Sequence, residues 1–162
     1  MIVEASTEDI DEVYELWRIL LEYHQGHHPV FRYKPGSGQV LKAELLARLK
    51  DKNTKVFVYQ LQDEWVGMII ASLKNAVAGY KLSNKGYIAE TVIRQEHRGG
   101  GIGRELFEAA RKWLLDKGAD HIELQVSLHN PSGIRFWESL GFTASTQHMI
   151  LPLQEAKHKK EQ

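Results

Sequence analysis

The sequence predicts a single α/β domain in which a mixed central sheet is flanked by about four helices. Strand-like and helix-like apolar patterns alternate along 162 residues, a length that suits one domain with a full core. One strand, at 86–94, runs through a glycine-rich turn directly into a helix. Neither an internal repeat nor a linker divides the chain. We therefore expect one domain over residues 1–154, followed by a charged tail over 155–162.

The first half of the chain predicts two helices and three strands. Ser6 or Thr7 can cap the first helix, and Gln62-Asp63 suggests the tight turn of an antiparallel hairpin. The segment between the helices is rich in histidine, proline and glycine and cannot be one regular element. The predicted elements are a strand at 1–5, a helix from 6 to about 23, a helix at about 40–50, and strands at 55–61 and 64–73.

The second half predicts the strand–turn–helix unit and a short closing region. Gly118 and Gly141 are placed as C-terminal caps of two helices, and Asn130-Pro131 suits the start of the second. The predicted elements are a polar loop at 75–85, a strand at 86–94, a helix from the glycines to Gly118, a strand at 122–128, a helix at 131–140, and one or two final strands. Four residues of those final strands are expected in the core, namely Met149, Ile150, Leu151 and Leu153.

Composition excludes several classes of protein. Lys+Arg 21 balances Asp+Glu 21, so a nucleic-acid or membrane-surface partner has no electrostatic support. The absence of cysteine excludes disulfides, thiolate metal sites and a cysteine nucleophile. No apolar run has the length of a membrane span, and the N-terminus lacks a signal-peptide pattern. These features predict a cytoplasmic globular domain.

The strand–glycine turn–helix unit predicts an anion site. The strand ends at Ile93, and Arg98 opens the run Arg-Gly-Gly-Gly-Ile-Gly-Arg. Glycines let a ligand approach the backbone closely, and the first N–H groups of a helix suit phosphate. A nucleoside-triphosphate loop would need Lys-Ser/Thr after the glycines, where Ile102-Gly103-Arg104 stands instead. A dinucleotide site would need its first glycine directly after the strand.

Two motifs resemble those of the GNAT superfamily of acetyl-CoA-dependent N-acetyltransferases. Its glycine signature is matched by Arg98, Gly101 and Gly103. A second family pattern consists of an asparagine, a short aromatic helix and a closing Gly-Phe. It is matched here by Asn130, Phe136, Glu138, Gly141 and Phe142. The resemblance covers residues 86–142 clearly, and the order of elements extends it over nearly the whole chain.

The resemblance implies a fold, a cofactor and a reaction. Strands around Glu90 to Ile93 and Ile122 to Leu128 would splay apart, and acetyl-CoA would enter between them with no metal required. An acetyl group would pass to a primary amine, and a backbone N–H at Val92 or Ile93 would bind the thioester oxygen. The implied cofactor-binding residues are Val92, Ile93, Arg98, Gly99, Gly100, Gly101, Ile102, Gly103, Arg104 and Asn130.

Glu90 and Trp137 are the candidate catalytic residues. A carboxylate among apolar neighbours, on the same nominal face as Ile88 and Val92, is costly unless it is paired or functional. The resemblance implies that Glu90 deprotonates the amine, whereas the alternative is a salt bridge at a sheet edge. Trp137 stands where such enzymes usually carry tyrosine. It either packs against the pantetheine arm of the cofactor or belongs to the core.

The acceptor and the partners stay open. His24, His27 and His28 lack a neighbouring cysteine or carboxylate cluster, so we expect no metal there, although with Tyr33 they could border the acceptor site. The acceptor could be a small molecule or a peptide, and homodimers are common in such families. A catalytically weak or inactive module that senses acyl-CoA is the alternative to an enzyme.

Overall fold

The computed structural model describes residues 1–27, 30 and 32–153 of the chain. They form a five-stranded sheet with the order β1-β2-β3-β4-β5, in which three pairings are antiparallel and the last is parallel. The strands are β1 (Ile2–Glu4), β2 (Thr54–Leu61), β3 (Glu64–Asn75), β4 (Asn84–Ile93) and β5 (His121–Leu124). The helices are α1 (Ile10–Gln25), α2 (Gly38–Lys50), α3 (Ile102–Asp116) and α4 (Pro131–Ser139). The predicted mixed sheet with about four helices is therefore confirmed.

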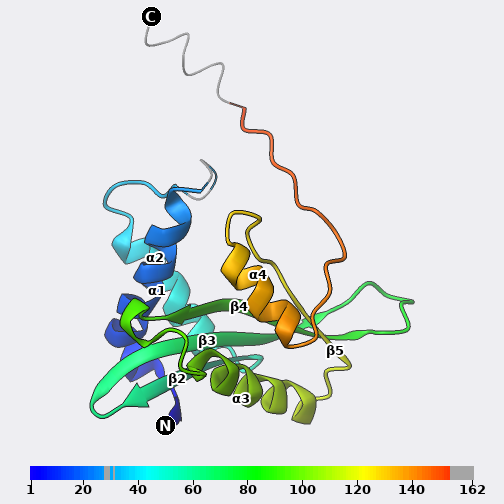
Figure 1. Cartoon of the computed structure of the whole chain (residues 1–162), viewed down its shortest axis with the longest axis horizontal. Coiled ribbons are helices and arrows are strands. Elements are labelled where there is room, and N and C mark those ends of the chain that lie inside the picture. Colours follow the sequence, from blue (N-terminus) through cyan, green and yellow to red (C-terminus); the bar gives the residue numbers. More distant parts are fainter. Residues whose placement is uncertain (28–29, 31, 154–162) are drawn as a thin grey trace, which may run out of the picture.

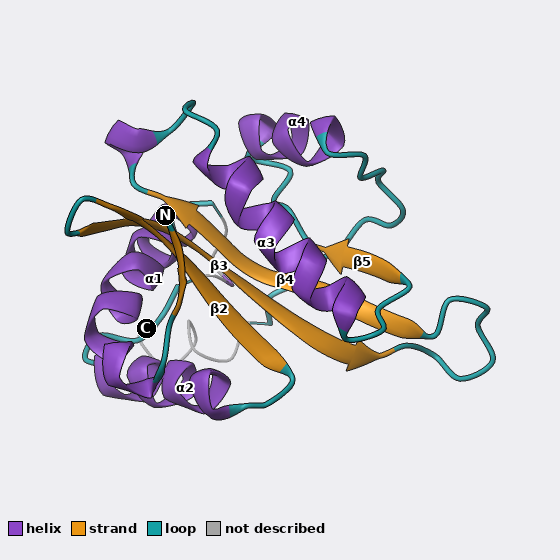
Figure 2. Ribbon diagram, turned by 90° about the horizontal axis from the view of Figure 1, so that it is seen from below, coloured by secondary structure: helices purple, strands orange, loops and turns teal. Residues whose placement is uncertain are grey.

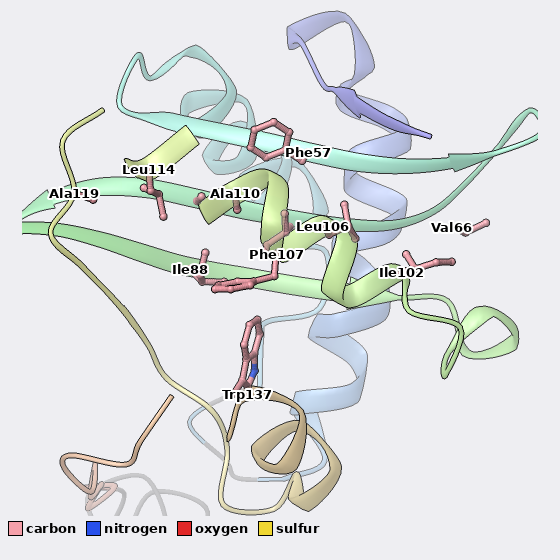
Figure 3. Packing of buried hydrophobic residues seen from close by; sticks show 12 residues of the cluster. Phe57, Val66, Ile88, Ile102, Leu106, Phe107, Ala110, Leu114, Ala119 and Trp137 are labelled. Carbon is pink, nitrogen blue, oxygen red and sulfur yellow. The ribbon is translucent and has the colours of Figure 1, made fainter. Parts of the chain in front are cut away.

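Helices cover both faces of the sheet. α1 and α2 lie on one face, and α3 with α4 lies on the other (Figure 1, Figure 2). Successive residues of β3 divide between these faces, because side chains alternate along a strand. Met68 and Ile70 join the cluster under α1 and α2, whereas Ile69 and Ala71 join the cluster under α3, part of which Figure 3 shows. This division explains why β3 reads as a continuous apolar run.

Two glycines let α3 lie close to the sheet. A Cβ at Gly67 would lie 3.3 Å from Cδ1 of Leu106, and a Cβ at Gly86 would lie 2.9 Å from Cδ1 of Leu114. Both leucines are fully buried. The start of α3 is thereby held against β3, and its last turns are held against the start of β4.

β4 contains one extra residue in its pairing with β3. Adjacent residues of β3 lie opposite Glu90 and Ile88, so Ala89 between them has no partner. A bulge of this kind bends the strand and increases its twist. The parallel pairing with β5 ends at the same place, because Ile88 with Leu124 is the last pair. From Ala89 onward β4 and β5 separate, as the resemblance implies.

The bulge also decides which face Glu90 occupies. Ile88 packs in the cluster under α3, but Val92 packs in the cluster under α1 and α2. Glu90 contacts Arg48 of α2, so it lies on the same face as Val92. Simple alternation along the sequence predicted Ile88 on the same face as Glu90 and Val92. That prediction is wrong, because the extra residue moves the side chains that follow it to the opposite face of the sheet.

Two predicted elements near the C-terminus need correction. The strand expected to reach residue 128 ends at Leu124, where β4 bends away from it. The strands expected after Phe142 are wrong, because residues 143–153 have no regular secondary structure. The four residues expected in the core there are exposed, namely Met149, Ile150, Leu151 and Leu153. The apolar pattern is present, but no strand of the described chain lies beside it. The charged tail at 155–162 lies outside the described residues.

Across the described ranges, none of the helices combines the length and the apolar character needed to span a bilayer.

We expect Gly67→Ala to lower the free energy of unfolding by about 1–3 kcal/mol, as for other overpacked cores. The added Cβ would lie 2.7 Å from Cδ1 of Ile93 and 3.1 Å from the carbonyl oxygen of Val92. Chemical denaturation measures the change. Gly26→Ala is the control, because nothing lies within 4 Å of its Cβ position. Equal changes in the two variants would contradict the close packing around Gly67.

Candidate functional site

The turn after β4 exposes main-chain N–H groups at the start of α3. Gly101 precedes the helix with φ 88°, a left-handed conformation that glycine adopts without strain. No side chain of the described residues caps this end, and the first helical bond runs from the Glu105 N–H to the Gly101 carbonyl, at 3.1 Å. The N–H groups of residues 102–104 therefore lack helical partners, an arrangement that with the helix dipole favours an anion.

The same turn is open in front of its glycines. No described atom lies within 4 Å of the Cβ positions of Gly99 and Gly101, and Gly100 meets only the His97 carbonyl, at 3.9 Å. Ile102 is buried and anchors the first turn of α3, whereas Arg104 is exposed. The predicted cradle from Gly99 to Arg104 thus has space for a ligand along its glycines.

Arg98 fastens the turn to the end of β4. Its Nε donates to the Ile93 carbonyl oxygen at 2.9 Å, and it forms no ion pair with any described residue. The sequence left Arg98 as either a surface charge or a phosphate contact. The geometry gives Nε a structural role and leaves the terminal guanidinium nitrogens for an anion bound at the turn.

β4 and β5 pair only as far as Ile88 and Leu124, and the side of β4 beyond that point is called the gap. Some main-chain N–H and carbonyl groups of β4 face it. The Arg94 N–H donates to the Val66 carbonyl of β3 at 2.8 Å. Successive residues of a strand direct their main-chain N–H groups to opposite sides. The Val92 N–H therefore also points to β3, whereas the N–H groups of Thr91 and Ile93 point to the gap. The hydroxyl of Thr91 is buried and has no hydrogen-bond partner among the described residues. Ile93, rather than Val92, is thus positioned to donate into the gap.

Glu90 is a partly buried carboxylate held by an arginine. Its side chain is 21% exposed, and its Oε1 accepts a bond from Nη1 of Arg48 at 3.3 Å. Arg48 also contacts Glu44 at 3.2 Å and lies over the ring of Trp17 at 5.3 Å. Burial raises the pKa of the Glu90 carboxyl above its usual value, and the Arg48 charge and the nearby Trp17 indole oppose that shift. Burial is the larger influence.

Arg48 and the bulge at Ala89 are the functional features that sequence reasoning missed. Arg48 lies 42 positions before Glu90, and nothing in the local pattern of α2 marks it as the partner of a strand residue. An extra residue in a strand likewise leaves no signature in a run such as Tyr-Ile-Ala-Glu-Thr-Val-Ile. The ion pair expected at a sheet edge is present, but on the interior strand β4.

A hollow of about 790 Å³ opens beside Glu90 on the face that carries α2. Glu90 and Tyr87 of β4 line it together with Arg48. Burial raises the pKa of Tyr87, and the Glu90 charge adds to that shift, so its phenol stays protonated at neutral pH. The other lining residues are mostly polar, namely Asp51, Asn53, Thr54, Ser72, Leu73, Lys74, Asn75, Asn84, Ala89 and Lys117.

Trp137 lies in the core under α3. It is 9% exposed, and its ring makes edge contacts with Phe107 at 5.9 Å and Phe142 at 5.5 Å between centroids. Figure 3 shows the indole projecting from α4 toward Phe107 and Ile88. Trp137 therefore belongs to the same buried cluster as Ile88, the last residue of β4 that pairs with β5.

Asn130 and Gly103 shape the start and the packing of α4. The Asn130 Oδ1 accepts the Gly133 N–H at 3.0 Å, so the predicted cap is present. A Cβ at Gly103 would lie 3.1 Å from Cζ of Phe136, which shows that this glycine lets α3 and α4 approach closely. Packing therefore favours glycine at position 103, whatever this residue contributes to a ligand site.

The histidines at the end of α1 and just after it form an aromatic cluster with the loop before α4. The ring centroids of Tyr23 and His27 lie 4.6 Å apart, and those of His27 and His129 lie 6.0 Å apart. Burial lowers the pKa of His24, and the neighbouring His27 lowers it further. The ring of Tyr33 has no contact with them among the described residues, and His28 lies outside those residues.

One group of described residues has the geometry for a divalent cation. The ligand atoms of Glu64, Glu96 and His97 all lie within 4.8 Å of one another. Both carboxylates are exposed, and Nε of Arg94 lies 3.7 Å from Glu64. The group contains neither Glu90 nor a histidine of the α1 cluster, and we assign it no role.

A family model described as the acetyltransferase (GNAT) family matches residues 10–142. The chain therefore belongs to the GNAT acetyltransferase family. It is 23% identical over 145 residues to an uncharacterised N-acetyltransferase, YobR, of Bacillus subtilis (strain 168), covering 90% of this chain and 49% of that protein. The chain spans about half the length of the curated relatives it matches first.

Solved structures share the fold over nearly the whole chain. A tetramutant of the BH1408 protein from Bacillus halodurans superposes with a TM-score of 0.82 at 27% identity, covering 94% of this chain and 99% of that one. An aminoglycoside N-acetyltransferase, AAC(6')-Iy, solved in complex with CoA, gives a TM-score of 0.76 at 17% identity, covering 95% and 94%. At that identity the second likeness shows the fold alone.

We expect the stability of the protein, relative to Glu90→Gln, to fall as pH rises from about 4 toward neutral. A carboxyl whose pKa is raised by folding binds more protons in the native state than in the unfolded state across this window. The free energy of unfolding then decreases with pH, and the glutamine variant lacks this decrease. Denaturation at a series of pH values measures it. Glu44→Gln, which removes the exposed carboxylate beside the same arginine, is the control. A pH dependence that Glu90→Gln leaves unchanged would contradict the assignment.

Proposed function

We propose that this protein is an N-acetyltransferase that moves an acetyl group from acetyl-CoA to a primary amine of a small molecule or peptide. One observation carries the proposal: β4 and its following turn hold three features in succession. Glu90 supplies a partly desolvated carboxylate, Thr91 and Ile93 direct main-chain groups away from β3 toward the gap, and the glycine turn presents free N–H groups. Membership in the GNAT family supports the same reaction.

The residues along the gap fit the chemistry of acetyl-CoA. The free N–H groups of residues 102–104 and the Arg98 guanidinium suit its pyrophosphate. Open space at Gly99 and Gly101 admits phosphate oxygens. When bound there, acetyl-CoA supplies the activated acetyl thioester. No step of the proposal requires a metal.

Glu90 is the proposed general base. A primary amine has a solution pKa near ~10 and is mostly protonated at neutral pH, so a base must release its lone pair. Burial makes Glu90 a stronger base than an ordinary carboxylate, because it raises the pKa of the group. Arg48 keeps it ionised in a desolvated position. Glu90 accepts the proton directly or through one water.

The Ile93 N–H is the proposed donor to the thioester oxygen. It faces the gap, whereas the Val92 N–H belongs to the ladder with β3. A donor fixed in a strand needs no reorganisation as negative charge develops, which makes it effective in catalysis. The bond between Arg98 and the Ile93 carbonyl holds this peptide in place.

Trp137 has a proposed role in shaping the gap. An indole N–H can donate a hydrogen bond but is far too weak an acid to surrender its proton. We assign the ring to packing at the inner end of the gap, against the pantetheine arm. Protonation of the departing thiolate is then left to water or to another group.

The hollow beside Glu90 is the proposed route of the acceptor. Its lining carries amides, hydroxyls and charges of both signs, which suits a polar amine. Asn84 and Tyr87 line it from the start of β4, whereas the glycine turn follows the end of β4. The acceptor and acetyl-CoA can therefore reach Glu90 from different directions. The proposal places the reaction in the cytoplasm, with no nucleic acid or membrane as partner.

Glu90→Gln should lower kcat by about 10²–10⁴-fold at neutral pH while acetyl-CoA affinity stays nearly intact. The loss should shrink at high pH, where more of the amine is neutral. In the parent, the acid limb of kcat/KM should lie above the pH of an ordinary glutamate because burial raises the pKa of Glu90. CoA release with a broad amine panel measures these rates. Glu44→Gln is the control, and an unchanged rate in Glu90→Gln would remove this residue from the mechanism.

Gly100→Val should weaken acetyl-CoA binding by at least about tenfold, or ~1.4 kcal/mol. Its side chain would enter the open space of the turn, where the described chain offers only the His97 carbonyl at 3.9 Å. Calorimetric titration measures the affinity, and denaturation should show unchanged stability. Gly26→Val, with an equally open Cβ position, controls for the substitution itself. Parent-like affinity would place the cradle elsewhere.

A second candidate function is an acyl-CoA sensor with little or no turnover. The specific observation in its favour is Trp137, which stands in the core at the position where the resemblance implies a tyrosine near the sulfur. Tight acetyl-CoA binding without CoA release across the amine panel would select the sensor. Turnover with any amine would select the enzyme.

A further inference from the structure

The hollow beside Glu90 carries two lysines at the end that lies farthest along β3 from this carboxylate. Lys74 belongs to the end of β3, and Lys117 directly follows α3. The Asp120 N–H donates to the Asn84 carbonyl at 2.9 Å, which places the chain after α3 beside the start of β4. Both lysines line the hollow, and neither forms an ion pair with any residue in the described ranges.

The two carboxylates that line the hollow have partners other than these lysines. Glu90 is paired with Arg48 at 3.3 Å. Asp51 accepts the Asn53 N–H at 2.9 Å and the Thr54 hydroxyl at 3.0 Å, which holds the turn between α2 and β2. Neither carboxylate therefore neutralises the outer end of the hollow.

The acidic residues just outside the hollow have partners as well. Glu123 lies 3.7 Å from Lys85 and 2.8 Å from Nε2 of His121. Asp120 accepts the Asn84 N–H at 3.1 Å and contacts Nδ1 of His121 at 2.7 Å. The neighbouring sequence adds no further acid, because residues 65–89 contain three lysines and neither Asp nor Glu. The charge of the two lysines thus stays available to a ligand.

The position of Lys74 sets the length of a ligand that reaches both ends of the hollow. Glu90 pairs with Ile70 of β3, and Lys74 lies four positions farther along that strand, a rise of about 13 Å. The lysine leans back along the sheet, because its Nζ lies 5.0 Å from the ring centroid of Tyr87, which pairs with Ser72. The ammonium and the Glu90 carboxylate are therefore on the order of 10 Å apart.

Three asparagines add neutral hydrogen-bonding groups to the same hollow, namely Asn53, Asn75 and Asn84. Their side-chain amides form no hydrogen bond with any residue that the structure describes. Each amide offers both donors and an acceptor, as the peptide group does. The lining therefore suits the main chain of a peptide that extends from Glu90 toward the lysines.

We propose that the acceptor is an acidic peptide, whose terminal amine reaches Glu90 while a carboxylate on its fourth residue binds Lys74 and Lys117. This assignment rests on the proposed acetyltransferase function and names its class of acceptor. Three steps along an extended peptide span about 10 Å, which matches the separation of the two charges. A free α-amino acid carries both groups on one carbon and cannot reach both ends. A polyamine would bring further positive charge to two lysines that repel it.

Amidated tetrapeptides with a free amino terminus test the proposed charge contact. Gly-Gly-Gly-Glu amide should have a KM about threefold to tenfold lower than Gly-Gly-Gly-Gln amide, since the contact is charged but partly exposed to solvent. Moving the acid to the second position, in Gly-Glu-Gly-Gly amide, should remove most of this preference. Raising the ionic strength should weaken it. Spermidine should be a poorer acceptor than the glutamate peptide.

Lysine variants assign the preference to the hollow. In Lys74→Gln and in Lys117→Gln, the KM ratio of the glutamine and glutamate peptides should fall toward one. Lys74→Arg keeps the charge and should retain the preference. Combining Lys74→Glu with Lys117→Glu should reverse it in favour of Gly-Gly-Gly-Arg amide, which a purely structural role would not do. Lys112→Gln, at an exposed lysine of α3 that does not line the hollow, is the matched control and should keep the parent ratio.

The possible results separate the acidic acceptor from the acetyltransferase reaction. Equal KM values for the two tetrapeptides would overturn the acidic acceptor and leave the reaction standing. A ratio that both glutamine variants leave unchanged, or that Lys112→Gln lowers equally, would overturn it as well. If the parent acetylates no amine, the reaction fails, and calorimetric titration of the two peptides in the presence of CoA decides. Tighter binding of the glutamate peptide would then support the site, and equal affinities would overturn it.

Discussion

The extra residue in β4 is the constraint on which the candidate site depends. Without Ala89 as a bulge, Glu90 would keep the phase of its neighbours and point into the apolar cluster under α3. The pairing of β4 with β5 ends at Ile88, next to this bulge, so the main-chain groups of Thr91 and Ile93 that face away from β3 have no ladder partner on β5. The irregularity thus places a carboxylate on one face, next to free main-chain groups at one edge. Bulges commonly re-aim side chains next to active sites.

The burial of Glu90 lowers the stability of the fold and raises the pKa of the carboxyl. A buried carboxylate costs stability unless its charge is compensated, and Arg48 supplies only part of the compensation because it also contacts Glu44. The net effect is a carboxyl whose pKa is raised, which is unfavourable for the fold and favourable for a base near neutral pH. Strain or unmet electrostatic needs of this kind tend to concentrate at functional sites.

Much of the fold was predictable because its signals are local. Each of these signals depends on residues close together in the sequence. Examples are the capping residues Asn130 and Gly118, the apolar stripe of α3 and the apolar run of β3. The glycine turn was predictable for the same reason, since its conformation belongs to Gly99 and Gly101 themselves.

The features that the sequence did not predict depend on distant contacts or on pairing. The ion pair between Arg48 and Glu90 joins a helix to a strand across the sheet, and the bulge exists only relative to β3. The prediction of closing strands after Phe142 was wrong for a related reason. The alternation of Met149, Leu151 and Leu153 favours a strand. A strand also needs a neighbouring strand to pair with, and the local sequence pattern does not show whether one is present.

The placement of the two openings has a kinetic meaning for the proposed reaction. The glycine turn lies past one end of β4, and the hollow begins at the other, so neither ligand crosses the path of the other. The chain also has no cysteine to carry an acetyl group between half-reactions. In the proposed reaction, donor and acceptor would therefore be bound together, and the two products would leave independently. Its initial-rate lines, plotted in double-reciprocal form for several acceptor concentrations, should therefore intersect instead of running parallel.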